Sequence, residues 1–268
     1  MHSEAAFARL PSVQRRSKHE EEISMRYLSR VTVGLVGFLV LALAATSWAQ
    51  QRDPIIEKIA KAYGLDSYDK IEAVRNTWNI DIPGLFKATH KWEWEPKTGK
   101  ISLESTDKDG KPVKVSYDSN QLGSQPDQVK NEVEPAFVND NYWLIFPFHA
   151  YWDKSATITN EPMKKLPIGA GSATLVSVKY PKEAGGFTPG DTWDLYIGAD
   201  NRVKQFVYHR GGNKPPLLVT ATWTGYKKAG PLLVSTEHRG NADSKPFHLW
   251  ITDVAVKLSG SDKWMPAQ

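Results

Sequence analysis

The sequence predicts a mainly β protein with a few helices, built as one antiparallel domain of about eleven strands. Three observations predict this fold class. From Ala73 onward, apolar and polar residues alternate with a period of two, which is typical of strands with one buried face. Turn signals such as Asp109-Gly110 separate these runs, and closely spaced runs favour an antiparallel meander. Composition does not shift over residues 50–268, so we expect no second domain there.

The N-terminal part of the chain has the pattern of an export signal. Residues 31–45 are an uncharged apolar run that follows two arginines and precedes Ser47-Trp48-Ala49, where small residues flank a cleavage site. We predict a signal peptide over 25–49, cleaved after Ala49, and residues 1–24 are interpreted as a polar extension or a start site placed too early. An uncleaved anchor is the alternative, although a bilayer needs about 20 apolar residues. In a double-membrane bacterium the product would be periplasmic, without stable membrane insertion.

A helix is predicted at the start of residues 50–268. Asp53-Pro54 has the residue types of a helix N-cap and first turn. Isoleucines at helical spacing follow, and Gly64 provides a common C-terminal stop.

A second helical segment is predicted between the two groups of strands. The polar residues 120–134 could begin a helix at Pro126, which Pro135 must interrupt. The aromatic-rich segment after it is predicted as a short helix that Asn139 or Asp140 caps and Pro147 ends. We expect Asn139–Trp152 to act as a lid.

Eleven runs are predicted as strands: 73–82, 87–95, 99–106, 111–119, 155–160, 173–180, 191–198, 202–210, 217–226, 230–238 and 246–257. Tight turns are expected at Ala199-Asp200-Asn201 and at Ala229-Gly230.

Composition excludes several classes of site. The chain has no cysteine, so disulfides, thiolate metal sites and a cysteine nucleophile are absent. The 34 Lys and Arg nearly balance the 30 Asp and Glu, which argues against a nucleic-acid partner. No histidines lie at metal-ligand spacing, so we predict no metal and no cofactor. A histidine-based hydrolase that uses His209, or His238 with Glu237, stays open as an alternative, because catalytic groups assemble in space.

Aromatic residues are the strongest functional signal, with 10 Trp, 10 Tyr and 9 Phe. Trp92 and Trp94 are two residues apart on one predicted strand, so they share one face of the sheet. Large aromatics on one face of a curved sheet either fill a core or line an apolar cavity. The candidate ligand-binding residues are Trp78, Trp92, Trp94, Trp143, Phe146, Trp193 and Trp223.

Several segments resemble a known family. Ile55–Leu65 and Ile71–Asn79 resemble the opening of the periplasmic lipoprotein-carrier superfamily, which includes LolA-like and LppX-like proteins and the sensor domain of RseB. Four further segments resemble exported proteins of that superfamily, and the first of them is the most specific: Asn139–Phe148, Phe187–Leu195 with Tyr196, Asn201–Tyr208 and Ser235–Gly240.

The resemblance implies a fold and a kind of function. The superfamily fold is an antiparallel half-barrel of eleven strands, closed on its concave side by short helices, where acyl chains bind. It implies that residues 50–268 form such a domain and that the protein is an exported, non-enzymatic binder of a lipid or lipoprotein acyl chain. A protein-binding sensor or scaffold that contacts an envelope protein is a further alternative.

Overall fold

Twelve antiparallel strands form one open sheet in the computed structural model, and eleven of them follow the order β4-β3-β2-β1-β13-β12-β9-β8-β7-β6-β5. The structure describes residues 53–107, 109–183 and 188–268. The predicted signal peptide 25–49 and the extension 1–24 therefore lie outside the described residues. All described residues belong to one compact unit.

The first group of strands comprises β1 (Ile71–Ile82), β2 (Phe86–Glu95), β3 (Lys100–Thr106) and β4 (Pro112–Asp118). The second group comprises β5 (Thr157–Lys165), β6 (Ser172–Lys179), β7 (Thr192–Ile197), β8 (Val203–His209), β9 (Leu218–Thr222), β12 (Glu237–Ala242) and β13 (Lys245–Leu258). The short strand β14 (Trp264–Pro266) pairs with β13, and β10 (Lys227–Ala229) with β11 (Leu232–Val234) forms a separate hairpin.

These strands confirm the predicted mainly antiparallel β fold, with one correction to the strand assignment. The predicted strand 230–238 is wrong as a single element, because it divides between β11 and the first residues of β12. The chain leaves the hairpin at Ser235, whose hydroxyl donates to the Thr224 carbonyl at 2.6 Å. The polar residues at this point thus make local bonds that end β11 before the main sheet resumes.

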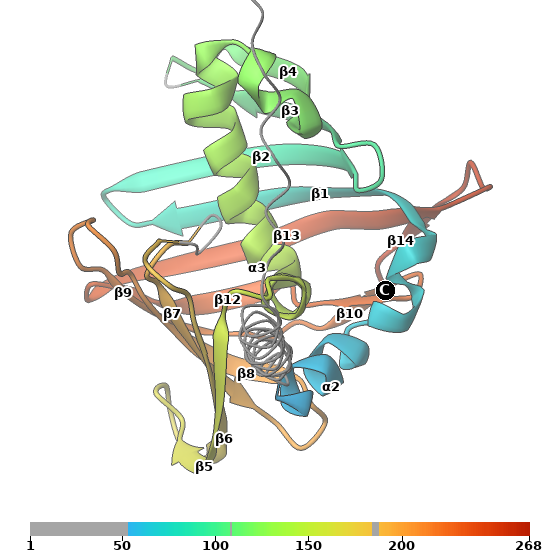
Figure 1. The fold of residues 1–268 in the computed structure, drawn as a ribbon. Helices are drawn as coiled ribbons and strands as arrows, with labels where there is room; N and C mark the ends of the chain where they lie inside the picture. The colour runs from blue at the N-terminus through green and yellow to red at the C-terminus, as the bar shows by residue number, and fades with distance from the viewer. Residues whose placement is uncertain (1–52, 108, 184–187) are drawn as a thin grey trace, which may run out of the picture. The chain divides into compact units, whose positions relative to one another are not determined.

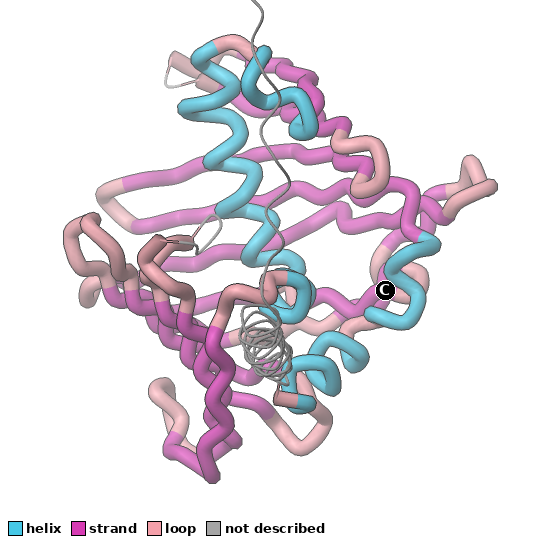
Figure 2. The backbone as a smooth tube through the Cα atoms, viewed as in Figure 1, coloured by secondary structure: helices cyan, strands magenta, loops and turns pink. Residues whose placement is uncertain are grey.

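The sheet bends around the long helix α3 (Glu134–Trp152), which lies along its face (Figures 1 and 2). Asp140 contacts Trp92 of β2, and Tyr142, two residues later, packs on Trp193 of β7. In a flat sheet the six steps from β2 to β7 would span about 29 Å. Both strands can contact one helical turn only because the sheet curves, which makes the helix-bearing face concave.

The first helix, α2 (Pro54–Ala62), begins as predicted. The Asp53 side chain accepts a hydrogen bond from the Ile55 amide at 2.9 Å, and Pro54 lies in the first turn, where its missing N–H costs nothing. Ile56, Ile59 and Ala60 form its buried face. A 3₁₀ turn, η1 (Leu65–Lys70), then leads into β1.

The prediction that Pro135 interrupts a helix is wrong. A π-helical segment, η3 (Val129–Val133), continues directly into α3, and Pro135 lies in the first turn of α3. The Glu134 amide donates to the Val129 carbonyl, five residues earlier. The wider π turn changes the hydrogen-bond register at this junction, so a residue without an N–H is accommodated.

The prediction that Pro147 ends the second helix is also wrong. Pro147 lies inside α3, and the chain kinks at Ile145, whose φ of −134° and ψ of 29° are not helical. The kink separates the proline ring from the preceding turn, so the helix continues to Trp152. Asn139 and Asp140 consequently lie within the helix and do not cap it.

One continuous core joins α2, α3 and the concave face of the sheet. Its largest fully buried side chains include Trp223, Tyr63, Tyr180, Phe146, Phe148 and Phe206. Among the described residues, no helix is both long and apolar enough to span a membrane.

Candidate functional site

A cleft of about 610 Å³ remains between α3 and strands β7, β8 and β9, on the concave side of the sheet. Helix α3 contributes one wall and the strands contribute the other. Its volume is within the range of about 300–1,000 Å³ that is usual for small-molecule sites. The aromatic side chains that line it are Tyr142, Trp143, Trp193, Phe206 and Tyr208.

The inner wall of the cleft is apolar and tightly packed. Trp193 lies against Phe146, with ring centroids 4.4 Å apart, and against Tyr208 at 4.7 Å. Phe206 is fully buried and contacts Trp143 edge to face at 5.2 Å. Strand alternation explains this arrangement, because paired residues of β7, β8 and β9 direct every second side chain toward α3. An apolar chain entering the cleft would contact these rings.

The indole nitrogen of Trp193 is buried and has no hydrogen-bond partner within the described part of the chain. A buried unpaired donor is costly unless a ligand or water accepts its bond. Burial also raises the pKa of Tyr142 to about 12, so its hydroxyl stays neutral at physiological pH. Neither group contributes a charge to the cleft.

Five charged residues line the cleft. Lys130, Arg210 and Lys214 are its cationic lining residues, and Glu134 and Asp191 are its acidic ones. This is a net formal charge of +1 from three cations and two carboxylates.

Both carboxylates are engaged by protein donors. The Tyr117 hydroxyl donates to Glu134 Oε2 at 2.5 Å. The Tyr208 hydroxyl donates to Asp191 Oδ2 at 2.7 Å, and the Gly211 amide donates to Oδ1 at 2.8 Å. Burial raises the pKa of Tyr208, and its bond to Asp191 adds to this effect.

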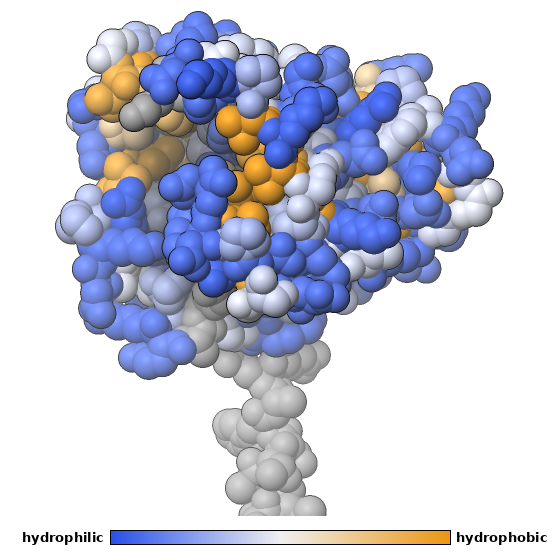
Figure 3. Space-filling model, turned by 90° about the horizontal axis from the view of Figure 1, so that it is seen from above, coloured by the Kyte–Doolittle hydropathy of each residue, from blue (hydrophilic) through white to orange (hydrophobic). Residues whose placement is uncertain are grey.

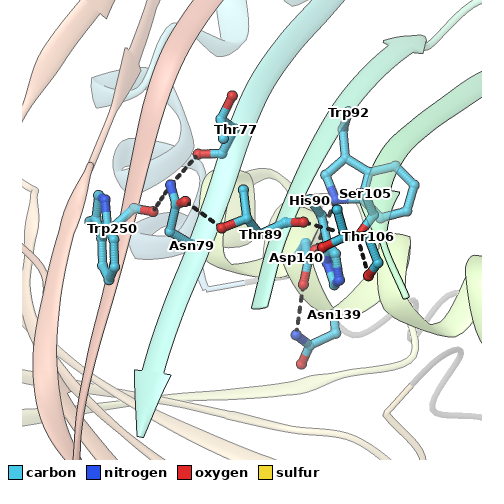
Figure 4. Close-up of polar contacts among 10 residues, drawn as sticks. All are labelled: Thr77, Asn79, Thr89, His90, Trp92, Ser105, Thr106, Asn139, Asp140 and Trp250. Carbon is cyan, nitrogen blue, oxygen red and sulfur yellow. Dashed lines mark hydrogen bonds and ion pairs between the residues drawn. The ribbon is translucent and has the colours of Figure 1, made fainter. Parts of the chain in front are cut away.

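A buried polar cluster attaches α3 to the sheet (Figure 4). Asp140 is 3% exposed, and its Oδ2 lies 2.6 Å from His90 Nδ1 and accepts from Trp92 Nε1 at 2.8 Å. The Asn139 amide donates to Oδ1 at 3.0 Å. Burial raises the pKa of Asp140, and the contacts with His90 and Trp92 oppose that shift. The carboxylate therefore joins the lid helix to β2 through several bonds.

A second polar group in the same region holds the neighbouring strands together (Figure 4). Asn79 of β1 donates to the Trp250 carbonyl at 3.3 Å and accepts from the Thr89 hydroxyl at 3.0 Å. Ser105 of β3 donates to the Thr89 carbonyl at 3.0 Å. Strand β2, which binds Asp140, is thus linked to β1 and β3 by side-chain bonds as well as by the sheet ladder.

The structure separates the seven candidate aromatic residues into three groups. Trp143 and Trp193 line the cleft. Phe146, Trp78, Trp92 and Trp223 are buried in the core, where Trp78 stacks on His90 at 5.4 Å and Trp223 contacts His238 at 4.5 Å. Trp94 is partly buried against Phe137. Helix α3 thus fills much of the concave face and leaves the cleft at one side.

Sequence reasoning did not select several lining residues. Tyr142 and Tyr208 face the cleft, as do the charged Arg210 and Lys214. Phe206 and Tyr208 are two residues apart on a predicted strand, so strand alternation could have assigned both to the same face of the sheet. Arg210 and Lys214 belong to the β8–β9 loop, and no periodic pattern identifies a loop residue as part of a site.

The histidines of the alternative hydrolase do not converge. His238 is fully buried beside Trp223, and its Nδ1 lies 3.2 Å from the Thr222 carbonyl. Glu237 pairs instead with His248 at 2.8 Å, and His209 pairs with Asp194 at 3.0 Å. Because Glu237 and His238 are neighbours on β12, their side chains point to opposite faces.

Within the described ranges, no three His, Asp or Glu side chains are grouped as metal ligands. The described surface seen from above in Figure 3 is mainly hydrophilic, with separate apolar patches. Leu85 and Phe86, adjacent at the β1–β2 turn, are among the large hydrophobic side chains that are exposed.

The solved structures that are similar to this chain include the following two. One is a DUF1329 family protein from Desulfovibrio piger, with a TM-score of 0.42 and 10% identity over 78% of this chain and 96% of that one. The other is a LolA superfamily protein from Nitrosomonas europaea, with a TM-score of 0.46 and 8% identity over 75% of this chain and 90% of that one. No family model and no curated protein matches the chain.

Proposed function

We propose that this chain is an exported, periplasmic, non-enzymatic protein that binds a lipid or lipoprotein acyl chain in the cleft beneath α3. The aromatic-lined cleft on the concave side of the sheet is the observation that carries this proposal. Each methylene transferred from water to such a site contributes about 0.8 kcal/mol. A ligand of this kind therefore binds well with few polar contacts.

Trp143 and Trp193 are the candidate residues that a ligand would meet first, because both line the cleft. Trp78, Trp92, Trp94, Phe146 and Trp223 would contact a longer chain only after α3 moves away from the sheet. Asn139–Trp152 acts as the lid in this proposal, and the Asp140 cluster holds it closed.

The experiment combines native extraction with a variant that fills the cleft. Protein purified from membrane-containing extracts and analysed by mass spectrometry should carry lipid, and purified protein should bind dodecanol. Val138→Trp places an indole on the α3 wall of the cleft, so it should reduce dodecanol binding. Val113→Trp on β4, outside the cleft lining, is the matched control and should bind normally. Protein that is reproducibly empty and does not bind dodecanol would contradict the proposal.

Export is tested separately. N-terminal sequencing of protein from the periplasmic fraction should begin at Gln50 if cleavage follows Ala49. Full-length protein that stays with the membrane would support the anchor alternative instead.

A further inference from the structure

We infer that the ligand of this cleft is an anionic amphiphile, whose acidic headgroup binds Arg210 and Lys214 while its chain lies against the aromatic wall. This inference rests on the proposed function, because it names the ligand class of the same cleft. The fatty-acid carboxylate and the phospholipid phosphate share this chemistry.

The side chains of Arg210 and Lys214 are the two cations that would bind an acidic headgroup. Among the described residues, neither Arg210 nor Lys214 has a carboxylate oxygen within 4.0 Å, although nine ion pairs of other Lys or Arg side chains occur. Arg210 Nη1 donates to the Pro215 carbonyl at 3.3 Å, which orients the guanidinium within the β8–β9 loop. Lys130, on the opposite wall, is already paired with Asp127 at 2.8 Å. The loop therefore places two cations at the cleft that no described carboxylate pairs with directly.

Two carboxylates in the cleft lining limit where an anionic headgroup can bind. Glu134 and Asp191 are both buried, and their oxygens accept bonds from Tyr117, Tyr208 and Gly211. They would repel an anion placed deep in the cleft. An anionic headgroup is consequently expected near the exposed Lys214, with the chain directed inward.

The cleft combines an apolar wall with cationic groups, as an anionic amphiphile requires. Trp143 and Trp193 give the cleft an apolar wall, and it also holds the Arg210 guanidinium and the exposed Lys214 ammonium. Arginine forms bidentate hydrogen bonds with planar carboxylates and with phosphates. A neutral or cationic amphiphile would lack this contact, and a cation would be repelled.

The experiment compares ligands that have one chain and different headgroups: dodecanoate, dodecyl phosphate, dodecanol and dodecyltrimethylammonium. The variant is Arg210→Gln/Lys214→Gln, and the matched control is Arg239→Gln/Lys228→Gln, two cations outside the cleft lining. We expect the cleft variant to bind dodecanoate or dodecyl phosphate about tenfold more weakly and to bind dodecanol almost unchanged. The control should leave all four affinities unchanged. Whichever anion binds more tightly distinguishes a fatty acid from a phospholipid source.

Two results would overturn the inference while leaving the proposed function intact. One is dodecanol binding as tightly as both anions, with no effect of the cleft variant. The other is tightest binding of dodecyltrimethylammonium, which would assign the headgroup contact to Glu134 and Asp191. If none of the four ligands binds, the proposed function itself fails.

Discussion

Gly64 and its neighbour Tyr63 attach the end of the first helix to two distant parts of the chain. Tyr226 donates its hydroxyl proton to the Val203 carbonyl at 2.5 Å, so Tyr63 donates to Tyr226 at 2.6 Å and accepts from the Val203 amide at 3.1 Å. Gly64 has a φ of +104°, and a Cβ there would lie 2.4 Å from the Pro231 carbonyl oxygen. Only glycine allows this contact without backbone movement.

Gly64→Ala should therefore reduce the free energy of unfolding by more than the strain of a positive φ alone, which is about 1–2 kcal/mol. Gly84→Ala is the matched control, because Gly84 has a φ of +72° and a Cβ there would meet no described atom within 4 Å, its chain neighbours aside. Urea denaturation followed by circular dichroism measures both variants. Equal losses in the two variants would contradict a steric role for the Pro231 contact.

His238 is a buried residue whose ionisation is linked to folding. Burial lowers the pKa of His238 from 6.5 to about 3. Between these values the unfolded chain binds more protons than the folded one, so stability is fully present above pH 6.5 and decreases as the pH falls toward 3.

His238→Asn should flatten the pH dependence of the free energy of unfolding by about 1.4 kcal/mol per pH unit within that window. Asparagine keeps a side-chain nitrogen that can donate to the Thr222 carbonyl. Denaturation midpoints at several pH values between 4.5 and 6.5 measure the slope. His209→Asn, on the exposed face, serves as the control, and an unchanged slope in His238→Asn would show that His238 does not titrate as described.

At the scale of elements, the attachment of α3 decides how the cleft forms. The helix packs through Phe137 on Trp92 at 5.3 Å and through Trp143 on Phe247 at 5.9 Å. Asp140 adds the buried polar bonds to β2. Aromatic packing is tolerant of small shifts, whereas hydrogen bonds require one geometry, so Asp140 specifies where the helix lies.

Asp140→Ala should lower the free energy of unfolding by about 3 kcal/mol, because the buried Trp92 N–H loses its acceptor and the carboxylate contact with His90 disappears. Hydrogen exchange of the amides in α3 should accelerate more than exchange in β7 and β8. Asp127→Ala, which breaks only the exposed pair with Lys130, should cost at most about 1 kcal/mol. Uniform acceleration across the domain would argue against a local anchor.

At the scale of the whole molecule, the concave face, α2 and α3 share one apolar core. Trp223, Trp193 and Trp92 belong to this same cluster although they lie on different strands. A contiguous core unfolds cooperatively in small domains. No cysteine is available for a disulfide, so packing of the sheet and helices provides the stability.

We expect the part from Gln50 onward to unfold in one transition. Tryptophan fluorescence and far-UV circular dichroism should give the same denaturation midpoint, since the indoles and the sheet belong to one cooperative unit. Two separated midpoints would mean that α3 and its aromatic contacts unfold before the sheet.

Local sequence patterns were sufficient for most elements. Alternation predicted β4 from Val113, Val115 and Tyr117, and Asp53-Pro54 predicted the start of α2. The incorrect helix predictions concern two prolines within one helical segment. Pro135 and Pro147 indicate breaks by local rules, but a π turn and a kink keep the segment helical, and its aromatic side chains are buried against the sheet.

The candidate site depends on contacts between residues that are distant in the chain. By itself, the sequence determined a mainly antiparallel β domain with its aromatics on shared faces, because strand periodicity and turn chemistry are local properties. Tertiary structure alone decided which aromatics line the cleft: Trp143 and Trp193 do, whereas Trp78 and Trp223 lie in the core away from it. The physical reason is that the position of α3 over the curved sheet, which these non-local contacts determine, divides one aromatic face into core and cleft.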